Sequence, residues 1–275
     1  MGNYRMIKAE GMLANFVKFF WTLDVQVSKD DSFVHRTLPD NCVELIFYCK
    51  GKFVISSVTE NEGSTFTSGV FGQFRAFRQF RTSADFCLFG VYLYPYALKI
   101  LFGFPASELI NEKIDTATLW GVDGKMLEER VILATTFEER IQYVSEFLLA
   151  KVMALGKYER IFVQQIKQVS DSCVVPSINS FAHDCNLSRR QLERKFRELS
   201  GFSPKDFFSI ARFQHALKEI EHGNNVLAQI AINAGYYDQS HFSNEFRKFS
   251  GYTPKQFILN LPPATNIRAT RDFRG

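Results

Sequence analysis

Two short segments of this chain collect long polar side chains with few carboxylates among them. The first segment carries Arg189, Arg190, Glu193, Arg194, Lys195 and Arg197, and the second carries Gln239, Ser240, His241, Asn244, Arg247 and Lys248. Lysine and arginine bind phosphate oxygens, while arginine, glutamine and asparagine can form paired hydrogen bonds with base edges in a major groove. The residue types therefore predict a protein that binds the phosphates of a nucleic acid and also recognises its base sequence.

Both segments belong to a unit that occurs twice in the chain. Residues 200–205, SGFSPK, return as residues 250–255, SGYTPK, and Phe196 matches Phe246 at the same offset. Self-similarity at a fixed period indicates two copies of one supersecondary unit.

Each copy is expected to be a helix, a tight turn and a second helix. In the first copy Ser188 and Gln191 form a capping box and Gly201 ends the second helix. The predicted inner face of its first helix is Ile178, Phe181, Ala182 and Cys185, and that of the second copy is Val226, Ile230, Ala231 and Ala234. Gly235 is expected in the second turn, with Asp238 capping the helix after it. This arrangement is typical of DNA-binding helix-turn-helix domains.

The spacing of these residues resembles the AraC/XylS family of bacterial transcription regulators over about the last 100 residues. The residues that carry the resemblance are Leu187-Ser188, Arg190, Leu192, Arg194, Phe196, Gly201, Ser203-Pro204, Arg212, Ile230-Ala231, the run from Ala234 to Arg247, Gly251 and Thr253-Pro254. It implies a seven-helix domain in which a helix from Pro204 to about Gly223 joins two helix-turn-helix units. Phe207, Phe208, Ala211, Leu217 and Ile220 are expected on the buried face of that helix. The resemblance also implies double-stranded DNA and RNA polymerase as partners.

The same resemblance assigns individual roles. Base readout is expected from Arg190, Glu193, Arg194, Gln239, Ser240, His241 and Asn244, and phosphate contact from Ser188, Arg189, Lys195, Arg197, Arg247 and Lys248. Phosphate contact or a local ion pair remains an alternative for one arginine of each pair, and Asn244 stands where many relatives carry arginine. The two recognition helices are expected to enter successive major-groove turns about 34 Å apart.

Three other polar residues have structural interpretations. Arg212 is expected to form an ion pair, with Asp238 as its partner. His183 and Cys185 have a spacing unsuited to one metal ion, which favours core packing for both. His241 lies at a helix start, where a capping or phosphate role is expected.

The first 125 residues or so are expected to be mostly β. The predicted strands are Val43 to Cys49, Phe53 to Val58, Phe74 to Arg81 and Phe86 to Tyr94. Phenylalanine and arginine recur every three residues in the third of these, which suits neither a strand nor a helix, and a bent edge strand is the interpretation. A short helix is expected from Pro95 to Gly103. Residues 38–45, 90–95 and 105–121 resemble the N-terminal part of a large AraC-type subgroup, which implies a cupin-like sensor domain.

The middle of the chain is expected to be helical. Thr136 and Glu139 predict a second capping box, and Phe137, Ile141, Val144, Leu148 and Val152 form an apolar stripe. Packing of this stripe on its own domain is favoured, with pairing to a second copy in a homodimer as the alternative. Leu155-Gly156 is a predicted hinge, and Ile161, Phe162, Ile166 and Val169 are expected to belong to the first helix of the DNA-binding domain.

The resulting prediction is an α+β chain with four regions. These are a β-rich sensor domain at 1–125, a helical linker and possible dimerisation region at 126–156, a DNA-binding domain at 157–261 and a basic tail at 262–275. Residues 1–174 carry a net charge of −1 and residues 175–275 a net charge of +5, which suits nucleic-acid binding by one domain. The tail arginines Arg268, Arg271 and Arg274 could add phosphate contacts.

Other function classes find little support. No apolar run approaches a membrane span, no signal-peptide pattern opens the chain, and five scattered cysteines suit a reducing cytoplasm. No catalytic or phosphate-binding motif is present and no cofactor or metal is expected; His35, Asp40 and Glu44 are the nearest approach to a cluster. The expected function is a DNA-binding regulator, not an enzyme, modulated by a small-molecule effector on the N-terminal domain. The alternatives are control by a protein partner or by abundance, and an enzyme that uses the β domain.

Overall fold

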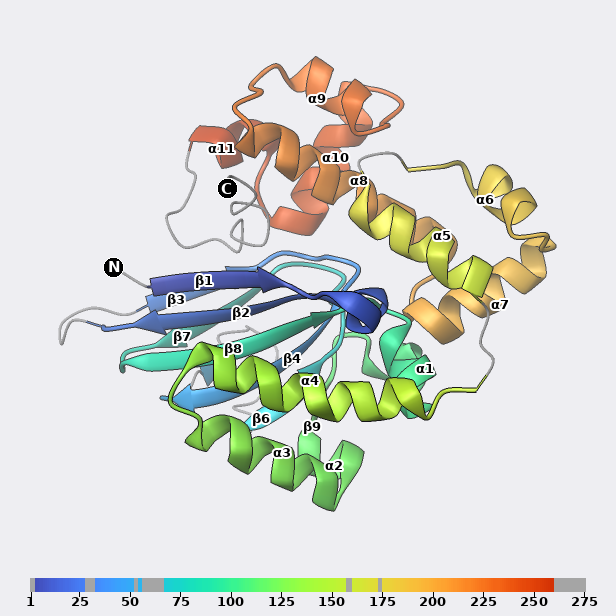
Figure 1. Cartoon of the computed structure of the whole chain (residues 1–275). Helices are drawn as coiled ribbons and strands as arrows, with labels where there is room; N and C mark the ends of the chain where they lie inside the picture. Colours follow the sequence, from blue (N-terminus) through green and yellow to red (C-terminus); the bar gives the residue numbers. More distant parts are fainter. Residues whose placement is uncertain are drawn as a thin grey trace.

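The computed structural model describes residues 3–27, 33–51, 54–55, 67–156, 160–172 and 175–259 (Figure 1). The fold is α+β, as the sequence predicted, because the strands come first and the helices follow. The basic tail at 262–275 lies outside the described residues.

Two antiparallel sheets form the first part of the chain. The larger sheet has the order β1-β2-β8-β4-β6-β9, and the smaller has the order β3-β7-β5. The strands are β1 (Asn3–Lys8), β2 (Val17–Val25), β3 (Phe33–Thr37), β4 (Val43–Lys50), β5 (Val54–Ile55), β6 (Ser68–Phe71), β7 (Arg78–Thr82), β8 (Phe86–Leu93) and β9 (Lys113–Asp115). A 3-10 helix, η1 (Gly11–Asn15), connects β1 to β2.

The larger sheet is buried on both faces, which explains the apolar composition of its central strands. On β8, Phe89 and Val91 belong to the core shared with the helices, whereas Phe86, Leu88 and Tyr92 belong to a second core. That second core also takes in Phe33 and Phe80 of the smaller sheet. Alternate side chains of a strand point to opposite faces, so β8 serves both cores at once.

The helices cover one face of the larger sheet and then form the C-terminal half (Figure 1). They are α1 (Ala97–Phe102), η2 (Ala106–Leu109), α2 (Thr116–Trp120), α3 (Val122–Leu133), α4 (Phe137–Met153), α5 (Arg160–Asp171), α6 (Ile178–Asp184), α7 (Arg189–Ser200), α8 (Pro204–Glu221), α9 (Leu227–Asn233), α10 (Gln239–Ser250) and α11 (Pro254–Leu259). The described helices include none long and apolar enough to cross a membrane.

The apolar stripe of α4 packs within the chain. The predicted capping box is confirmed, with Thr136 and Glu139 each bonding to backbone at the helix start. Phe137, Val144 and Leu148 are buried, and the ring of Phe137 meets that of Phe89 edge-on at 5.9 Å. The favoured intramolecular packing is therefore confirmed for these three positions.

The phenylalanine and arginine stretch was interpreted wrongly as an edge strand over 74–81. Only Arg78–Thr82 is a strand, and β7 lies at the centre of the smaller sheet. The period of three arises because the earlier residues leave the sheet: Phe77 donates its N–H to the carbonyl of Phe249, 3.1 Å away in the C-terminal half. Of the predicted strand Phe53 to Val58, only Val54–Ile55 lies within the described residues.

Two burial predictions were also wrong. Val226 is 63% exposed because the first helix of the second copy begins after it, with Val226 as its N-cap. The residues expected in one helix from Ile161 to Val169 do lie in α5, whose buried residues are Phe162, Val163, Ile166 and Val169. His183 is exposed at the end of α6 instead of packing in the core, whereas Cys185 is half-buried.

Candidate nucleic-acid interface

The first copy of the repeated unit consists of α6, a turn and α7. Ser177 caps α6 by accepting a hydrogen bond from the N–H of Ser180 at 3.0 Å. Asn186 adopts φ 55° in the turn, a left-handed conformation that asparagine tolerates better than most residues. The predicted capping box of Ser188 and Gln191 then starts α7, and Gly201 ends it with φ 75°.

The second copy has the same construction. Gly235 turns the chain after α9 with φ 79°, and the Asp238 carboxylate accepts the N–H of His241 at 2.7 Å. Helix α10 ends at Gly251 with φ 78°. The predicted cap and stop of the first copy, and the predicted turn and cap of the second, are therefore confirmed.

Helix α8 joins the copies through two groups of aromatic side chains. Phe207 and Phe208 at its start contact Phe196 of α7, with ring centroids 5.3 and 5.6 Å apart. Further along α8, Phe213 contacts Phe246 and Phe249 of α10, each at 5.2 Å. All five residues predicted on the buried face of this helix are buried: Phe207, Phe208, Ala211, Leu217 and Ile220. Shared packing on one helix fixes the two units relative to each other.

The residues predicted to contact bases are all exposed. On α7 these are Arg190, Glu193 and Arg194, and on α10 they are Gln239, Ser240, His241 and Asn244. No described residue forms an ion pair with Arg190 or Arg194, so both guanidinium groups are available to a ligand.

The residues predicted to contact phosphate differ in how far they are already engaged. Arg189, Arg197, Arg247 and Lys248 are exposed, while Lys195 is half-buried with its ammonium 5.9 Å from the centre of the Phe162 ring. The hydroxyl of Ser188 is held within the capping box, bonded to Gln191. Among the base-readout residues, the His241 ring lies 3.7 Å from Glu245 and edge-on to Tyr236.

Arg212 forms an ion pair with Glu245, not with Asp238 as predicted. Its Nη2 lies 3.6 Å from Glu245 Oε2 and donates to the hydroxyl of Ser209 at 3.0 Å. Asp238 is occupied in capping α10, which explains the difference. The contact links α8 to α10 from the inside, so it supports the orientation of the second recognition helix.

The β-rich half docks on equivalent turns of both copies. After α7, Arg75 forms an ion pair with Asp206 at 3.1 Å and lies over the Phe202 ring at 5.4 Å. After α10, the buried guanidinium of Arg36 is 3.8 Å from the Phe77 ring and 4.3 Å from the Tyr252 ring. The repeated segment therefore ends each recognition helix and also anchors it to the sheets.

The contact between the β-rich half and the two helix-turn-helix units leaves the starts of α7 and α10 exposed to solvent. It reaches α8 as well, where Asn41 donates to the carbonyl of Phe207 at 2.9 Å and Gln214 donates to that of Pro39 at 2.6 Å. On α7 it extends to Glu198, which pairs with Lys99 at 3.2 Å. The exposed polar residues toward the helix starts remain open to solvent beside this contact.

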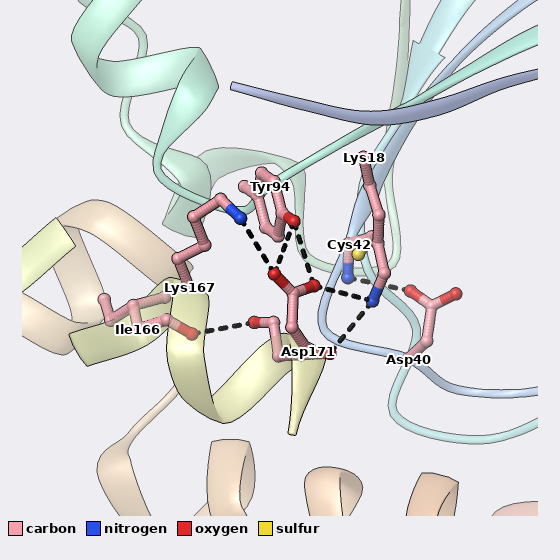
Figure 2. Close-up of polar contacts among 8 residues, drawn as sticks. Lys18, Asp40, Cys42, Tyr94, Ile166, Lys167 and Asp171 are labelled. Carbon is pink, nitrogen blue, oxygen red and sulfur yellow. Dashed lines mark hydrogen bonds and ion pairs between the residues drawn. The ribbon is translucent and has the colours of Figure 1, made fainter. Parts of the chain in front are cut away.

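A cavity of about 540 Å³ lies between the larger sheet, α5 and α8. Its charged lining includes four lysines and two aspartates: Lys8, Lys18, Lys167, Lys218, Asp40 and Asp171. Figure 2 shows Asp171 at the centre of a set of polar contacts, where it accepts from Tyr94 at 2.7 Å and pairs with Lys18 at 3.4 Å and Lys167 at 2.9 Å. Residues of both halves of the chain thus surround one space.

The electrostatics of this cavity keep its central ion pair charged. Burial alone would lower the pKa of Lys18, but the surrounding negative groups outweigh it and the pKa is raised. Burial likewise opposes ionisation of Asp171, yet the two lysines hold its pKa below the usual range. Burial raises the pKa of Asp40 to about 6, so this carboxyl takes up a proton just below neutral pH.

Two buried polar atoms of the lining lack a hydrogen-bond partner among the described residues. They are Nδ1 of His215 on α8 and Oδ1 of Asn41 on the β-rich side. Burying a polar group without a partner is unfavourable, by about 1–3 kcal/mol. Sequence reasoning missed these residues, because nothing in the spacing of Asn41 and His215 indicates that the fold brings them to one cavity.

Two family descriptions match the chain. Residues 5–115 match a domain of unknown function, DUF6597, and residues 181–259 match a helix-turn-helix domain. Among curated proteins, the Msm operon regulatory protein of Streptococcus mutans is 24% identical over 154 residues, 55% of each chain. The transcriptional activator RhaS of Escherichia fergusonii is 30% identical over 70 residues, 26% of this chain and 25% of RhaS. The chain thus spans about half or less of the length of these relatives.

Among solved structures, ToxT of Vibrio cholerae matches 89% of this chain and 98% of its own, with 14% identity and a TM-score of 0.45. The duplicated helix-turn-helix unit and the family match define residues 181–259 as a helix-turn-helix domain, and the curated relatives that match the chain are transcription regulators. In this domain the chain resembles the regulators of the AraC/XylS family.

Proposed function

We propose that this regulator reads DNA with the exposed faces of α7 and α10 in successive major grooves. The observation that carries the proposal is the pair of equivalent helices on one joining helix, each with its polar side chains open to solvent. Arg190 and Arg194 can each bond twice to guanine, Glu193 can accept from cytosine, and Gln239 or Asn244 can pair with adenine. Ser240 and His241 complete the proposed base-reading set.

Phosphate contact is proposed for Ser188, Arg189, Lys195, Arg197, Arg247 and Lys248. Five of these side chains are cationic, so DNA binding should weaken steeply with salt. In a gel-shift titration, log affinity against log salt concentration should have a slope of about −4.5 if all five neutralise phosphates. The Arg247→Ala variant should reduce the slope by about one. A slope near zero would contradict the proposal.

We further propose that a small organic anion bound in the cavity modulates DNA binding. Lysines outnumber aspartates in the lining, which also includes the polar side chains of His215 and Gln214. Because the cavity is lined from the sheet and from α8, a ligand there would touch the element that carries both helix-turn-helix units. This differs from an effector held wholly inside the β-rich half.

Thermal shift with a panel of small carboxylates and phosphate esters tests the effector proposal. A compound at 100 times its Kd should stabilise the protein by about 2.7 kcal/mol and change its affinity for DNA. The Ala14→Phe variant, which fills part of the cavity, should lose the shift. Ala150→Phe, on the exposed side of α4, is the matched control and should keep it. Equal shifts in both variants, or hits without any change in DNA affinity, would reject this site.

Control by a protein partner or by abundance remains the second candidate. It would be favoured if ligand binding in the cavity did not change the affinity for DNA. Three apolar side chains of α3, Val122, Met126 and Leu133, are exposed, and we propose them as the contact surface if the protein forms a homodimer. RNA polymerase is the proposed partner in transcription. We also propose the division at residues 125, 156 and 261 into sensor, linker, DNA-binding domain and tail.

A further inference from the structure

Two cysteines of the larger sheet lie side by side at an irregularity in strand pairing. Between β4 and β8 the register runs from Tyr48 opposite Leu88 to Lys50 opposite Cys87, so Cys49 is the extra residue of a β-bulge. In such a bulge two residues of one strand oppose a single residue of the other. Cys49 and Cys87 therefore come from neighbouring strands at the same level of the sheet.

The two cysteines are neighbours across the two strands. Both are free and half-buried, and the thiol of Cys49 donates to the carbonyl of Phe47 at 3.9 Å. Residues opposite each other on antiparallel strands have Cα atoms about 4.5–5.5 Å apart, which lies within the range that a disulfide spans. The fold therefore permits this pair to be joined without rearranging the sheet.

A cation from α4 distinguishes the two sulfurs. Arg140 places Nη1 3.5 Å from the sulfur of Cys87 and donates through Nη2 to the carbonyl of Ala134 at 3.1 Å. The other charged groups near Cys87 are its cross-strand neighbours Asp24 on β2 and Lys50 on β4, both exposed. The neighbouring thiol of Cys49, with the contribution of Arg140, lowers the pKa of Cys87 to about 6. The pKa of Cys49 is raised, chiefly by the neighbouring thiol of Cys87.

We propose that Cys49 and Cys87 form a peroxide-sensitive thiol pair, with Cys87 as the attacking residue and Cys49 as the resolving residue. The thiolate of Cys87 attacks a hydroperoxide; a sulfur–oxygen bond forms, the oxygen–oxygen bond breaks, and the alcohol or water departs after taking up a proton. The thiol of Cys49 then attacks the sulfenic acid, and water leaves as the disulfide forms. Two thiols are oxidised and one peroxide is reduced.

The arrangement has a mechanical consequence at the start of α4. In the disulfide, Cys87 no longer carries the negative sulfur that faces Arg140, so the contact that ties this helix to β8 loses its charge. Arg140 keeps its bond to Ala134, which belongs to the connection before α4 rather than to the sheet. Oxidation is therefore expected to loosen first the start of α4 and the contact of this helix with β8.

Hydrogen peroxide treatment of the purified full-length chain tests the pair. Peptide mapping by mass spectrometry should find a Cys49–Cys87 disulfide that dithiothreitol removes. In Cys49→Ser, Cys87 should instead be trapped by dimedone as a sulfenic acid, whereas in Cys87→Ser, Cys49 should stay reduced. Cys185→Ser, which changes a cysteine of the helix-turn-helix unit, is the control and should leave the crosslink unchanged.

The role of the arginine is tested by Arg140→Met, which keeps the aliphatic bulk. Alkylation of Cys87 at about pH 5, below its pKa, should slow by about tenfold for each rise of one in the pKa, because the thiolate fraction falls in that proportion at such pH. Arg140→Lys retains the positive charge and should restore part of the rate. A disulfide formed with other cysteines in place of this pair, or unchanged oxidation of Cys49 in Cys87→Ser, would overturn the proposal.

Discussion

Replacing Phe196 with alanine should lower the free energy of unfolding by about 3–5 kcal/mol. Phe196 is fully buried, and its ring meets those of Phe162, Phe181, Phe207 and Phe208 at 5.1–5.6 Å. Removing it leaves a cavity where α5, α6, α7 and α8 converge, and the surrounding rings can refill it only partly. Chemical denaturation followed by circular dichroism measures the change.

The neighbouring residue provides the control for that prediction. Arg197 is exposed on the same helix, so Arg197→Ala should change stability by less than about 0.5 kcal/mol. Phe246→Ala tests the equivalent position of the second copy, where the ring contacts Phe213, Phe242 and Phe257. A loss below about 1 kcal/mol for both phenylalanines would mean that the aromatic clusters do not hold the two units on α8.

Replacing Arg194 with alanine should weaken binding to cognate DNA by about 1–3 kcal/mol and relax specificity at one base pair. The side chain is exposed on α7 and has no ion-pair partner among the described residues, so little of the loss would come from the folded protein itself. Arg190→Ala should behave in the same way at another base pair. Binding titrations on cognate and single-substituted duplexes measure both effects.

Arg247→Ala separates base readout from charge. Arg247 lies in the last turn of α10, and its loss should weaken binding to cognate and random DNA alike. If Arg190→Ala and Arg194→Ala also lost the same affinity on both kinds of DNA, these arginines would contact phosphate only. Both variants are expected to keep the fold of α7. Their thermal unfolding should therefore match that of the unmodified protein, and this measurement is the control for folding.

The duplicated unit could be predicted from sequence because its signals are local. Caps at Ser188 and Asp238 and stops at Gly201 and Gly251 act within one helix turn, and the repeat presents each of them twice. The β-rich half was harder. Strand β2, residues 17–25, is buried along nearly its whole length, so it lacks the alternation that marks a half-buried strand.

Contacts between the halves could not be predicted from the same signals. The sandwich of Arg36 between Phe77 and Tyr252 joins residues from three distant parts of the chain, and neither sequence spacing nor composition relates them. The ion pair of Arg212 was expected, but its partner depends on whether Asp238 or Glu245 is free once α10 is capped. Packing between the helices, and not the local sequence, determines which carboxylate pairs with Arg212.

The glycines that end the two recognition helices have a second importance. A Cβ at Gly201 would lie 2.9 Å from the carbonyl oxygen of Ala106, and one at Gly251 would lie 2.4 Å from the ring of Phe77. A side chain at either position would therefore clash with a residue outside the DNA-binding half. A chimeric regulator that grafts this half onto a foreign sensing half would inherit the two glycines but neither of the surfaces that fit them. Rebuilding that junction would require at least the segment around Ala106 and Ile110 together with Arg36, Arg75 and Phe77.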